Sequence, residues 1–181
     1  MHFRGSKQRY ESTYRIKGMS DTPVNESISE TVRELIRRNI SITCMESVTG
    51  GMLASLITDT EGASSIFKGS FVTYSNESKI NAGVDSAIIE KYGVYSHECA
   101  KEMARAVRSA FGADIGIGIT GVLKNIDPAN TEGEPGRVFF AIEYDGGIIT
   151  ECIDDVPLTE RSASKAYICR RVMDRVKREC L

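Results

Sequence analysis

Hydrophobic residues between positions 28 and 36 recur with the period of an amphipathic helix. Ile28, Val32, Leu35 and Ile36 stand at i, i+4, i+7 and i+8, which places them on one helix face. The pattern predicts a helix that packs this face against a core. Three small polar residues are candidate N-caps for it: Asn25, Ser27 and Ser29.

A strand, a glycine turn and a short helix follow. Alternation and β-branched residues over 40–45 predict the strand, and Leu53, Leu56 and Ile57 give 52–58 the apolar face of a helix. The turn Glu46–Gly51 joins the two. A strand that passes through a glycine turn into a helix presents backbone N–H groups to an anion.

The rest of the chain continues to mix strands and helices. Strands are predicted over 67–74, 113–119, 137–144 and 148–153, and helices over 75–82, 96–111 and 159–180. The turn 145–147 makes a hairpin of the last two strands. Gly and Ile alternate over 113–119, which indicates a buried strand whose small residues permit close packing. We therefore predict an α/β fold: a single-domain, three-layer α/β/α sandwich with a mixed sheet.

Composition and charge narrow the class of protein. The chain has 181 residues, 41% of them apolar, and a formal net charge of −2, which argues against a nucleic-acid partner for the domain. No apolar run approaches the roughly 20 residues of a membrane span, and the N-terminus has no apolar signal-peptide core. We expect a cytoplasmic protein. Residues 1–21 are basic without apolar periodicity, so we expect a disordered tail, with a targeting peptide as the alternative, before one domain over 22–181.

Cysteine and histidine usage limits the chemistry. The five cysteines are widely spaced without a C-x-x-C pair, and His2 and His97 are the two histidines of the sequence. A His-based metal site or a Ser-His-Asp triad has little material here, so we expect no metal and no cofactor. The cysteines are interpreted as small buried hydrophobes.

Three polar clusters at predicted strand ends are candidates for chemistry. In the first, Ser47 can attack a carbonyl if a base takes its proton, and Gly50 and Gly51 let a substrate approach the backbone. In the second, Tyr74 and Lys79 can act as bases, since histidines are nearly absent from the chain. By themselves these clusters are more often a capped glycine turn, a half-buried aromatic and a surface lysine.

The third cluster is Thr120-Gly121, which opens a long loop over 122–136. Thr120 can donate a hydrogen bond to a substrate, although the same pair can simply end a strand. Arg161, at the beginning of the last helix, is a candidate clamp for a phosphate or carboxylate. Ligand sites in open α/β sheets gather beyond the strand ends, so a common sheet edge would bring the three clusters together.

The ordered runs Glu46-Ser47-Val48-Thr49-Gly50-Gly51, Phe71-Val72-Thr73-Tyr74-Ser75-Asn76-Glu77-Ser78-Lys79 and Ile119-Thr120-Gly121 resemble the CinA C-terminal domain family. That family includes stand-alone nicotinamide-nucleotide amidases. The resemblance covers roughly 27–180 and implies a three-layer α/β/α fold, oligomerisation, and hydrolysis of nicotinamide mononucleotide to nicotinate mononucleotide and ammonia. The resemblance thus implies a role in the pyridine nucleotide cycle of NAD metabolism.

The resemblance also implies roles for single residues. Ser47 matches the nucleophile, and Tyr74 and Lys79 match the candidate base and activating residues. The positions that match the substrate pocket are Thr49, Gly50, Gly51, Asn76, Thr120, Gly121 and, as a phosphate contact, Arg161. In the expected mechanism Lys79, directly or through Tyr74, deprotonates Ser47, and N–H groups near Gly50 and Gly51 stabilise the oxyanion.

Two features of the chain depart from the family pattern. Val48 stands where the family often has Cys, an apolar exchange that we expect to be tolerated. The residues 122–128 replace the usual Gly/Pro-rich continuation, which bears on substrate preference and activity. Two rival functions follow: a non-catalytic nucleotide-binding protein of a competence or DNA-damage response, and a hydrolase for a different amide.

Overall fold

A mixed five-stranded sheet forms the centre of the computed structural model, which describes residues 23–124, 128, 130–145, 147–158 and 160–181. The strand order is β2-β1-β3-β4-β5, in which β2, β1 and β3 run parallel and β4 and β5 are antiparallel to their neighbours. The strands are β1 (Ile42–Glu46), β2 (Phe67–Val72), β3 (Ile115–Gly121), β4 (Val138–Tyr144) and β5 (Gly147–Ile153).

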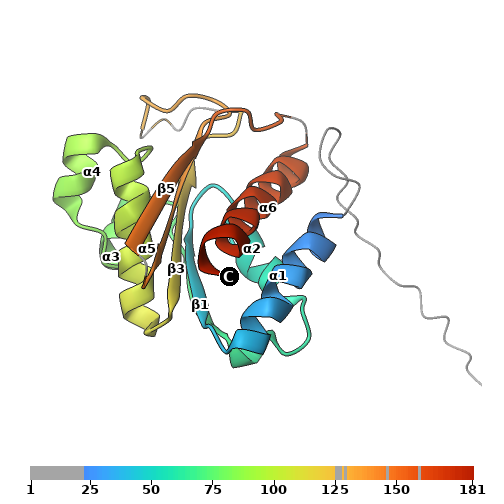
Figure 1. Ribbon diagram of the computed structural model, residues 1–181. Helices are drawn as coiled ribbons and strands as arrows, with labels where there is room; N and C mark the ends of the chain where they lie inside the picture. The colour runs from blue at the N-terminus through green and yellow to red at the C-terminus, as the bar shows by residue number, and fades with distance from the viewer. Residues whose placement is uncertain (1–22, 125–127, 129, 146, 159) are drawn as a thin grey trace, which may run out of the picture.

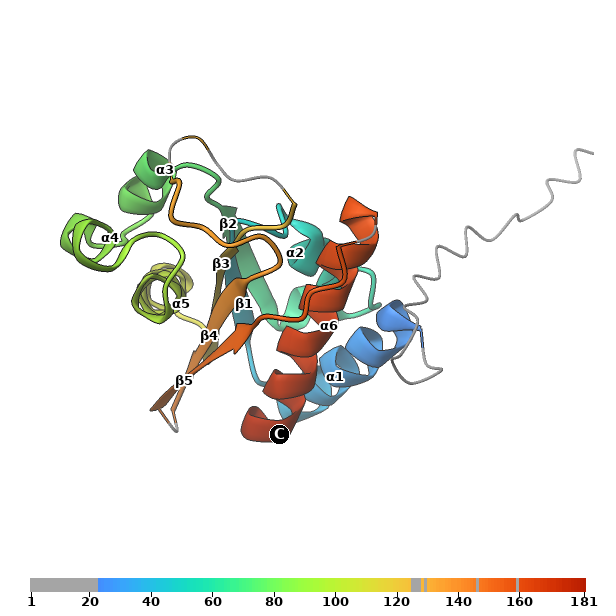
Figure 2. The same ribbon diagram turned by 90° about the horizontal axis from the view of Figure 1, so that it is seen from above.

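Helices cover both faces of this sheet (Figures 1 and 2). One face carries α1 (Val24–Arg38), α2 (Met52–Thr58) and α6 (Arg161–Cys180). The other carries α3 (Asn76–Asn81), α4 (Ser86–Tyr92) and α5 (His97–Phe111). A short 3-10 turn, Ala63–Ser65, precedes β2. The α/β class, the mixed sheet and the three layers are confirmed.

Helix α1 buries the predicted apolar stripe but begins earlier than its candidate caps. Ile28, Val32 and Leu35 are fully buried against the sheet and α6. The helix begins at Val24, after Pro23, without a side-chain cap hydrogen bond. The capping role expected for Asn25, Ser27 or Ser29 is therefore wrong. These residues lie inside the helix, where Ser27 Oγ donates to Asp174 of α6 over 3.2 Å.

The other predicted elements differ from the structure mainly at their ends. The predicted helix 52–58 matches α2. The helices predicted to begin at Ser75 and Ser96 begin one residue later, because these two serines are the N-caps of α3 and α5. Helix α4, a single short helix capped by Asp85, was not predicted from the sequence. The expected tail at 1–21 lies outside the described residues.

Two glycines of β3 allow α5 to approach the sheet closely. A methyl group on Gly118 would lie 2.2 Å from the carbonyl oxygen of Ala100, and one on Gly116 would lie 2.4 Å from that of Ala104. Any larger residue would have to push the helix away. The alternation of Gly and Ile thus gives the close packing that the sequence predicted.

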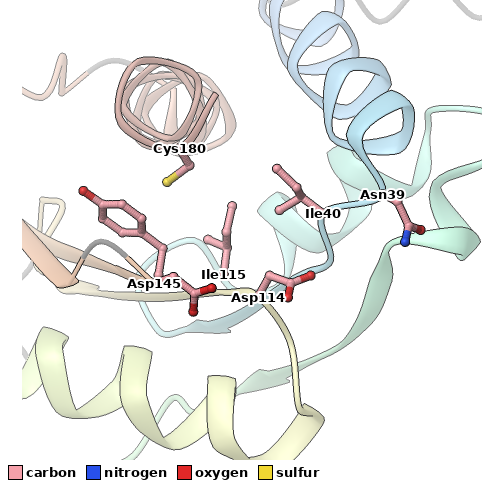
Figure 3. A pocket seen from close by; sticks show the side chains of 7 residues that line it. Asn39, Ile40, Asp114, Ile115, Asp145 and Cys180 are labelled. Carbon is pink, nitrogen blue, oxygen red and sulfur yellow. The ribbon is translucent and has the colours of Figure 1, made fainter.

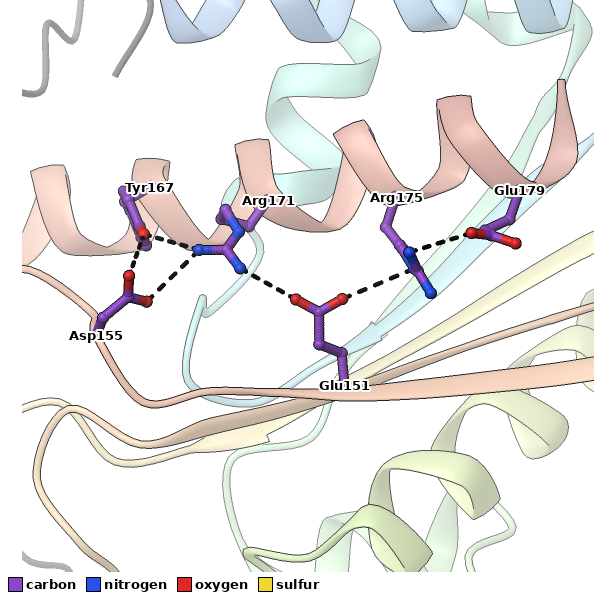
Figure 4. A network of polar contacts seen from close by, with 6 residues as sticks. All are labelled: Glu151, Asp155, Tyr167, Arg171, Arg175 and Glu179. Atoms are coloured by element: carbon purple, nitrogen blue, oxygen red, sulfur yellow. Dashed lines mark hydrogen bonds and ion pairs between the residues drawn. The ribbon is translucent and has the colours of Figure 1, made fainter. Parts of the chain in front are cut away.

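A chain of polar contacts joins α6 to the edge strand β5 (Figure 4). Glu151 on β5 accepts a hydrogen bond from Arg171 over 3.0 Å and pairs with Arg175 at 3.7 Å. Arg171 also donates to the hydroxyl of Tyr167 over 2.9 Å. Such half-exposed pairs add little stability each, but the network orients α6 against the sheet.

Candidate active site

The polar clusters of the sequence meet at one pocket beyond the carboxyl ends of β1, β2 and β3. The pocket is small and partly open to solvent. Its residues come from the turn after β1, the segment after β2, the loop before α5, the loop after β3 and the beginning of α6. They are Ser47, Val48, Tyr74, Tyr95, Gly121, Val122, Leu123 and Arg161.

Ser47 and Lys79 form a buried pair at this pocket. Lys79 Nζ lies 3.2 Å from Ser47 Oγ and donates to the carbonyl of Thr73 over 3.0 Å. Lys79 is 2% exposed and Ser47 is 7% exposed. Burial disfavours the charged form of an amine, and a neutral amine can accept a hydroxyl proton. The pair can therefore generate a serine nucleophile without histidine.

The segment after β2 fixes Lys79 in this position. The N–H of Thr73 donates to the carbonyl of Glu46 over 2.8 Å, which holds the segment against β1. Ser75 and Ser78 then cap α3 reciprocally, so that the helix begins at a defined residue. Lys79 in the last turn of α3 is thereby directed toward the end of β1, next to Ser47.

One cationic side chain of α6 lines the pocket, and a second lies beside the glycine turn next to it. Arg161 Nη2 donates to the hydroxyl of Tyr74 over 3.0 Å, and both residues line the pocket. Lys165 follows one helical turn later, and its Nζ would lie 3.1 Å from a methyl group placed on Gly50. The two cations give this side the charge that a phosphate would need.

The turn after Ser47 is stabilised by the buried side chain of Glu46. This carboxylate accepts hydrogen bonds from the N–H groups of Gly51, Leu53 and Ala54 over 3.0, 3.1 and 2.9 Å. The N–H of Gly50 donates to the carbonyl of Ser47 over 3.1 Å. The N–H groups of Gly50 and Gly51 are thus both bonded within the turn, so an oxyanion donor near these glycines would have to be another N–H group.

Two other N–H groups of the same turn are available. Those of Val48 and Thr49 have no acceptor within the part of the chain that the structure describes. The hydroxyls of Thr49 and Thr73 are also buried there without a partner among the described residues. Unpaired buried polar groups are rare in folded proteins, and their concentration beside Ser47 is typical of a functional site.

Two expected substrate contacts instead bind other parts of the chain. The hydroxyl of Thr120 is fully buried and donates to the carbonyl of Val94 over 2.8 Å, so it is not free to donate to a substrate. The amide of Asn76 donates to Asn130 over 2.9 Å, which joins α3 to the loop after β3. Thr49, Asn76 and Thr120 do not line the pocket, whereas Gly121 does.

Sequence reasoning missed several residues of the site. Tyr95, Val122 and Leu123 line the pocket, Glu46 builds the turn, and Lys165 lies beside Gly50. The position of Lys165, four residues after Arg161, was a usable signal because both then share a helix face. Tyr95 had no such signal, since it precedes a helix and belongs to none of the predicted polar clusters.

A second hollow at the opposite edge of the sheet offers no comparable chemistry (Figure 3). It lies between α6 and the beginnings of β1 and β3, and it is open to solvent. The thiol in this hollow belongs to Cys180. Burial raises the pKa of this thiol to about 11, so it stays protonated at neutral pH. Its carboxylates, Asp114 and Asp145, bind Ser41 and Arg108.

The cysteines nearest to the site are also poor nucleophiles. Burial raises the pKa of the Cys99 thiol to about 11 although Lys79 acts in the opposite direction. Burial, together with the charge of Glu46, raises the pKa values of Cys44 and Cys169 well above the usual range. These three behave as the buried hydrophobes that the sequence predicted, whereas Cys152 and Cys180 are partly exposed.

In the part of the chain that the structure describes, none of the helices combines the length and the apolar character of a membrane span.

Comparisons with known proteins agree on one family. The sequence profile of the CinA C-terminal domain matches residues 24–180. A Bacillus subtilis protein with the provisional name competence-damage inducible protein is 40% identical over 131 residues, which are 71% of this chain and 30% of that protein. A Moorella thermoacetica protein of the same name is 39% identical over 71% of this chain and 31% of its own length. The chain thus spans about 30% of the length of these relatives.

Solved structures show the same fold. A CinA superfamily protein from Klebsiella pneumoniae is 26% identical with a TM-score of 0.79, over 87% of this chain and 98% of its own. A CinA superfamily protein from Escherichia coli is 26% identical with a TM-score of 0.77, over 90% and 94% of the two chains. These two similarities cover 87% and 90% of this chain.

Proposed function

The chain belongs to the CinA C-terminal domain family, and from this premise we propose that it is a serine amidohydrolase that converts nicotinamide mononucleotide to nicotinate mononucleotide and ammonia. One observation carries the proposal: Lys79 Nζ lies 3.2 Å from Ser47 Oγ, and both are buried at a pocket that Arg161 also lines. A nucleophile, a base and a cation for the phosphate are thus present at one place.

The first half of the reaction forms an acyl-serine. Neutral Lys79 donates one N–H to the carbonyl of Thr73 and accepts the proton of Ser47, whose Oγ attacks the carboxamide carbon. The carbonyl π bond breaks to give an oxyanion, for which the N–H groups of Val48 and Thr49 are the donors we propose. Lys79 then returns the proton to the amide nitrogen, the C–N bond breaks and ammonia leaves.

The second half releases the acid. Lys79 takes a proton from a water molecule, the resulting hydroxide attacks the acyl carbon, and the ester bond to Ser47 breaks as Lys79 returns the proton to Oγ. The direct contact between Lys79 and Ser47 supports Lys79 as the base. The hydroxyl of Tyr74 is bound by Arg161, which supports a role for Tyr74 in orienting that cation.

The test is ammonia release from the purified chain with a panel of pyridine compounds: nicotinamide, its riboside, its mononucleotide and the dinucleotide. We expect turnover of the mononucleotide, and a loss of about 10³-fold or more in kcat for Ser47→Ala. Ser55→Ala, an exposed serine of α2, is the matched control and should keep full activity. Full activity of Ser47→Ala would refute the mechanism.

The rival functions make different predictions in the same panel. A non-catalytic nucleotide-binding protein, which the names of the relatives would suit, would bind the mononucleotide in calorimetry without releasing ammonia. A hydrolase for a different amide would neither bind nor hydrolyse it. Cytoplasmic location and assembly into a homo-oligomer remain expectations from the sequence and the family resemblance.

A further inference from the structure

Tyr95 forms an aromatic part of the pocket wall, and none of the sequence motifs includes it. It lines the same pocket as Ser47 and is half-buried. Its buried side packs against both hydrophobic clusters under α5, which contain Met103 and Ala100 among other residues. Tyr95 is therefore held by the core on one side and also contributes to the lining of the pocket.

The backbone around Tyr95 is held on both sides. The carbonyl of Val94 accepts the hydroxyl of Thr120 over 2.8 Å. Ser96 Oγ donates to the carbonyl of Gly93 over 2.9 Å and accepts the N–H of Cys99 over 3.1 Å. These bonds fix the loop to β3 and to the first turn of α5. Tyr95 thus has a defined position before any ligand arrives, which lowers the entropic cost of binding.

The ring itself is also confined. A methyl group on Gly133 would lie 2.7 Å from Tyr95 Cε2, so the loop after β3 packs closely on one edge of the ring. Val122 and Leu123 of the same loop are buried and line the pocket beside it. This wall is apolar and aromatic, in contrast to the polar Ser47 and Lys79.

The charges around the pocket differ between its sides. Arg161 and Lys165 supply positive charge from α6, as described above. Outside the pocket lining, the Glu132 carboxylate would lie 3.1 Å from a methyl group on Gly93, two residues before Tyr95. An aromatic ring also carries negative potential over its face and attracts cations. The pocket is therefore suited to a ligand with an anion at one end and a planar cation at the other.

Resting on the proposed function, we infer that Tyr95 is the specificity-determining residue for the acyl part of the substrate, and that it selects N-alkylpyridinium carboxamides through their positive ring. A pyridinium is flat and cationic, whereas the corresponding 1,4-dihydropyridine is neutral and nearly the same size. Tyr95 discriminates between these two rings, while Arg161 holds the phosphate that both mononucleotides share.

The experiment compares the oxidised and reduced mononucleotides on Tyr95 variants. KM and kcat are measured for ammonia release from nicotinamide mononucleotide, and the reduced form is measured as a competitive inhibitor. Tyr95→Leu should raise KM for the cationic ring about tenfold, the value of a cation–π contact of about 1.4 kcal/mol, and leave kcat and the inhibition constant of the neutral ring within about twofold. Tyr95→Phe should preserve all three constants.

Controls separate this inference from the proposed function. Tyr92→Leu, in α4 and outside the pocket lining, is the matched control and should change nothing. Tyr95→Met replaces the leucine variant if circular dichroism shows that the latter is unfolded. Equal effects on both rings, or no effect on either, would overturn the inference. If the wild type binds the mononucleotides without turnover, the proposed function fails, and dissociation constants from calorimetry still test the role of Tyr95 in the same way.

Discussion

Replacing Glu46 by Gln tests how the turn that carries Ser47 is built. The carboxylate is fully buried; its Oε2 accepts from Gly51 and Leu53, and its Oε1 accepts from Ala54. A glutamine has one acceptor oxygen, so its NH₂ group must face at least one of these N–H donors. In the better orientation of the glutamine amide, one hydrogen bond is lost. In the opposite orientation, two hydrogen bonds are lost.

The size of the effect follows from these contacts. Each hydrogen bond to a charged acceptor contributes about 1.5–3 kcal/mol, and the carboxylate at the beginning of α2 adds roughly 0.3–1 kcal/mol through the helix dipole. The lower cost of burying a neutral side chain offsets part of this loss. We expect the free energy of unfolding to fall by about 2–3 kcal/mol, which lowers Tm by roughly 5–10 °C in a domain of this size.

Activity should fall as well, although Glu46 does not line the pocket. Glu46 immediately precedes Ser47, and a displacement of about 1 Å in a reacting group can cost 100-fold in rate. Urea unfolding and ammonia release are measured on the same preparation, with Glu61→Gln, an exposed glutamate, as the matched control. If both variants have the same midpoint and the same kcat, the carboxylate does not build the turn and the reasoning is wrong.

Three further predictions follow from contacts of single side chains. Lys79→Met should lower kcat by about 10²–10⁴-fold while the chain stays folded, because the base is lost. Arg161→Met should raise KM for the mononucleotide about tenfold and leave that for the riboside unchanged, because one charge-assisted contact to the phosphate is lost. Hydrogen bonds from Ser41 hold the pKa of Asp114 below its usual range, so Asp114→Asn should cost about 1 kcal/mol of stability at pH 6.

Each of these has a control or a condition that can contradict it. Lys91→Met on α4 and Arg178→Met in the last turn of α6 are exposed and should leave kcat and KM unchanged. A lowered pKa stabilises the fold above the unfolded value of about 3.9, and this contribution is lost as pH falls through the folded value. The difference between Asp114→Asn and wild type in urea unfolding should therefore shrink as pH falls below the unfolded value, and a constant difference across pH would refute the assignment.

The sequence predicted the location of the site better than its internal contacts. Ser47 and Tyr74 follow β1 and β2, and Gly121 is the last residue of β3. These three parallel strands are neighbours in the sheet, so the topology alone brings the residues to one edge. Lys79 lies one helical turn beyond that edge, and the capped start of α3 directs it inward. These placements depend on strand ends and helix periodicity, which are visible in the residue pattern.

Hydrogen-bond partners could not be predicted in the same way. Whether a glycine N–H is free for a substrate depends on which acceptor reaches it, and here the side chain of Glu46 occupies that of Gly51. Thr120 likewise binds a carbonyl 26 residues away in the sequence. Such contacts depend on the packed positions of distant segments, and no local pattern encodes them.

The close approach of α5 to β3 has a consequence for how the pocket could change over evolution. Tyr95 lies two residues before the first residue of α5, so the spacing between helix and sheet determines how far its ring stands from the turn at Ser47. That spacing is set by Gly116 and Gly118. Because these residues have no side chain, α5 packs so close to them that even a methyl group would not fit. A larger residue at either glycine would push α5 away from β3 and so move Tyr95 away from Ser47, which widens the pocket. Substrate range can therefore shift through positions that never touch a ligand.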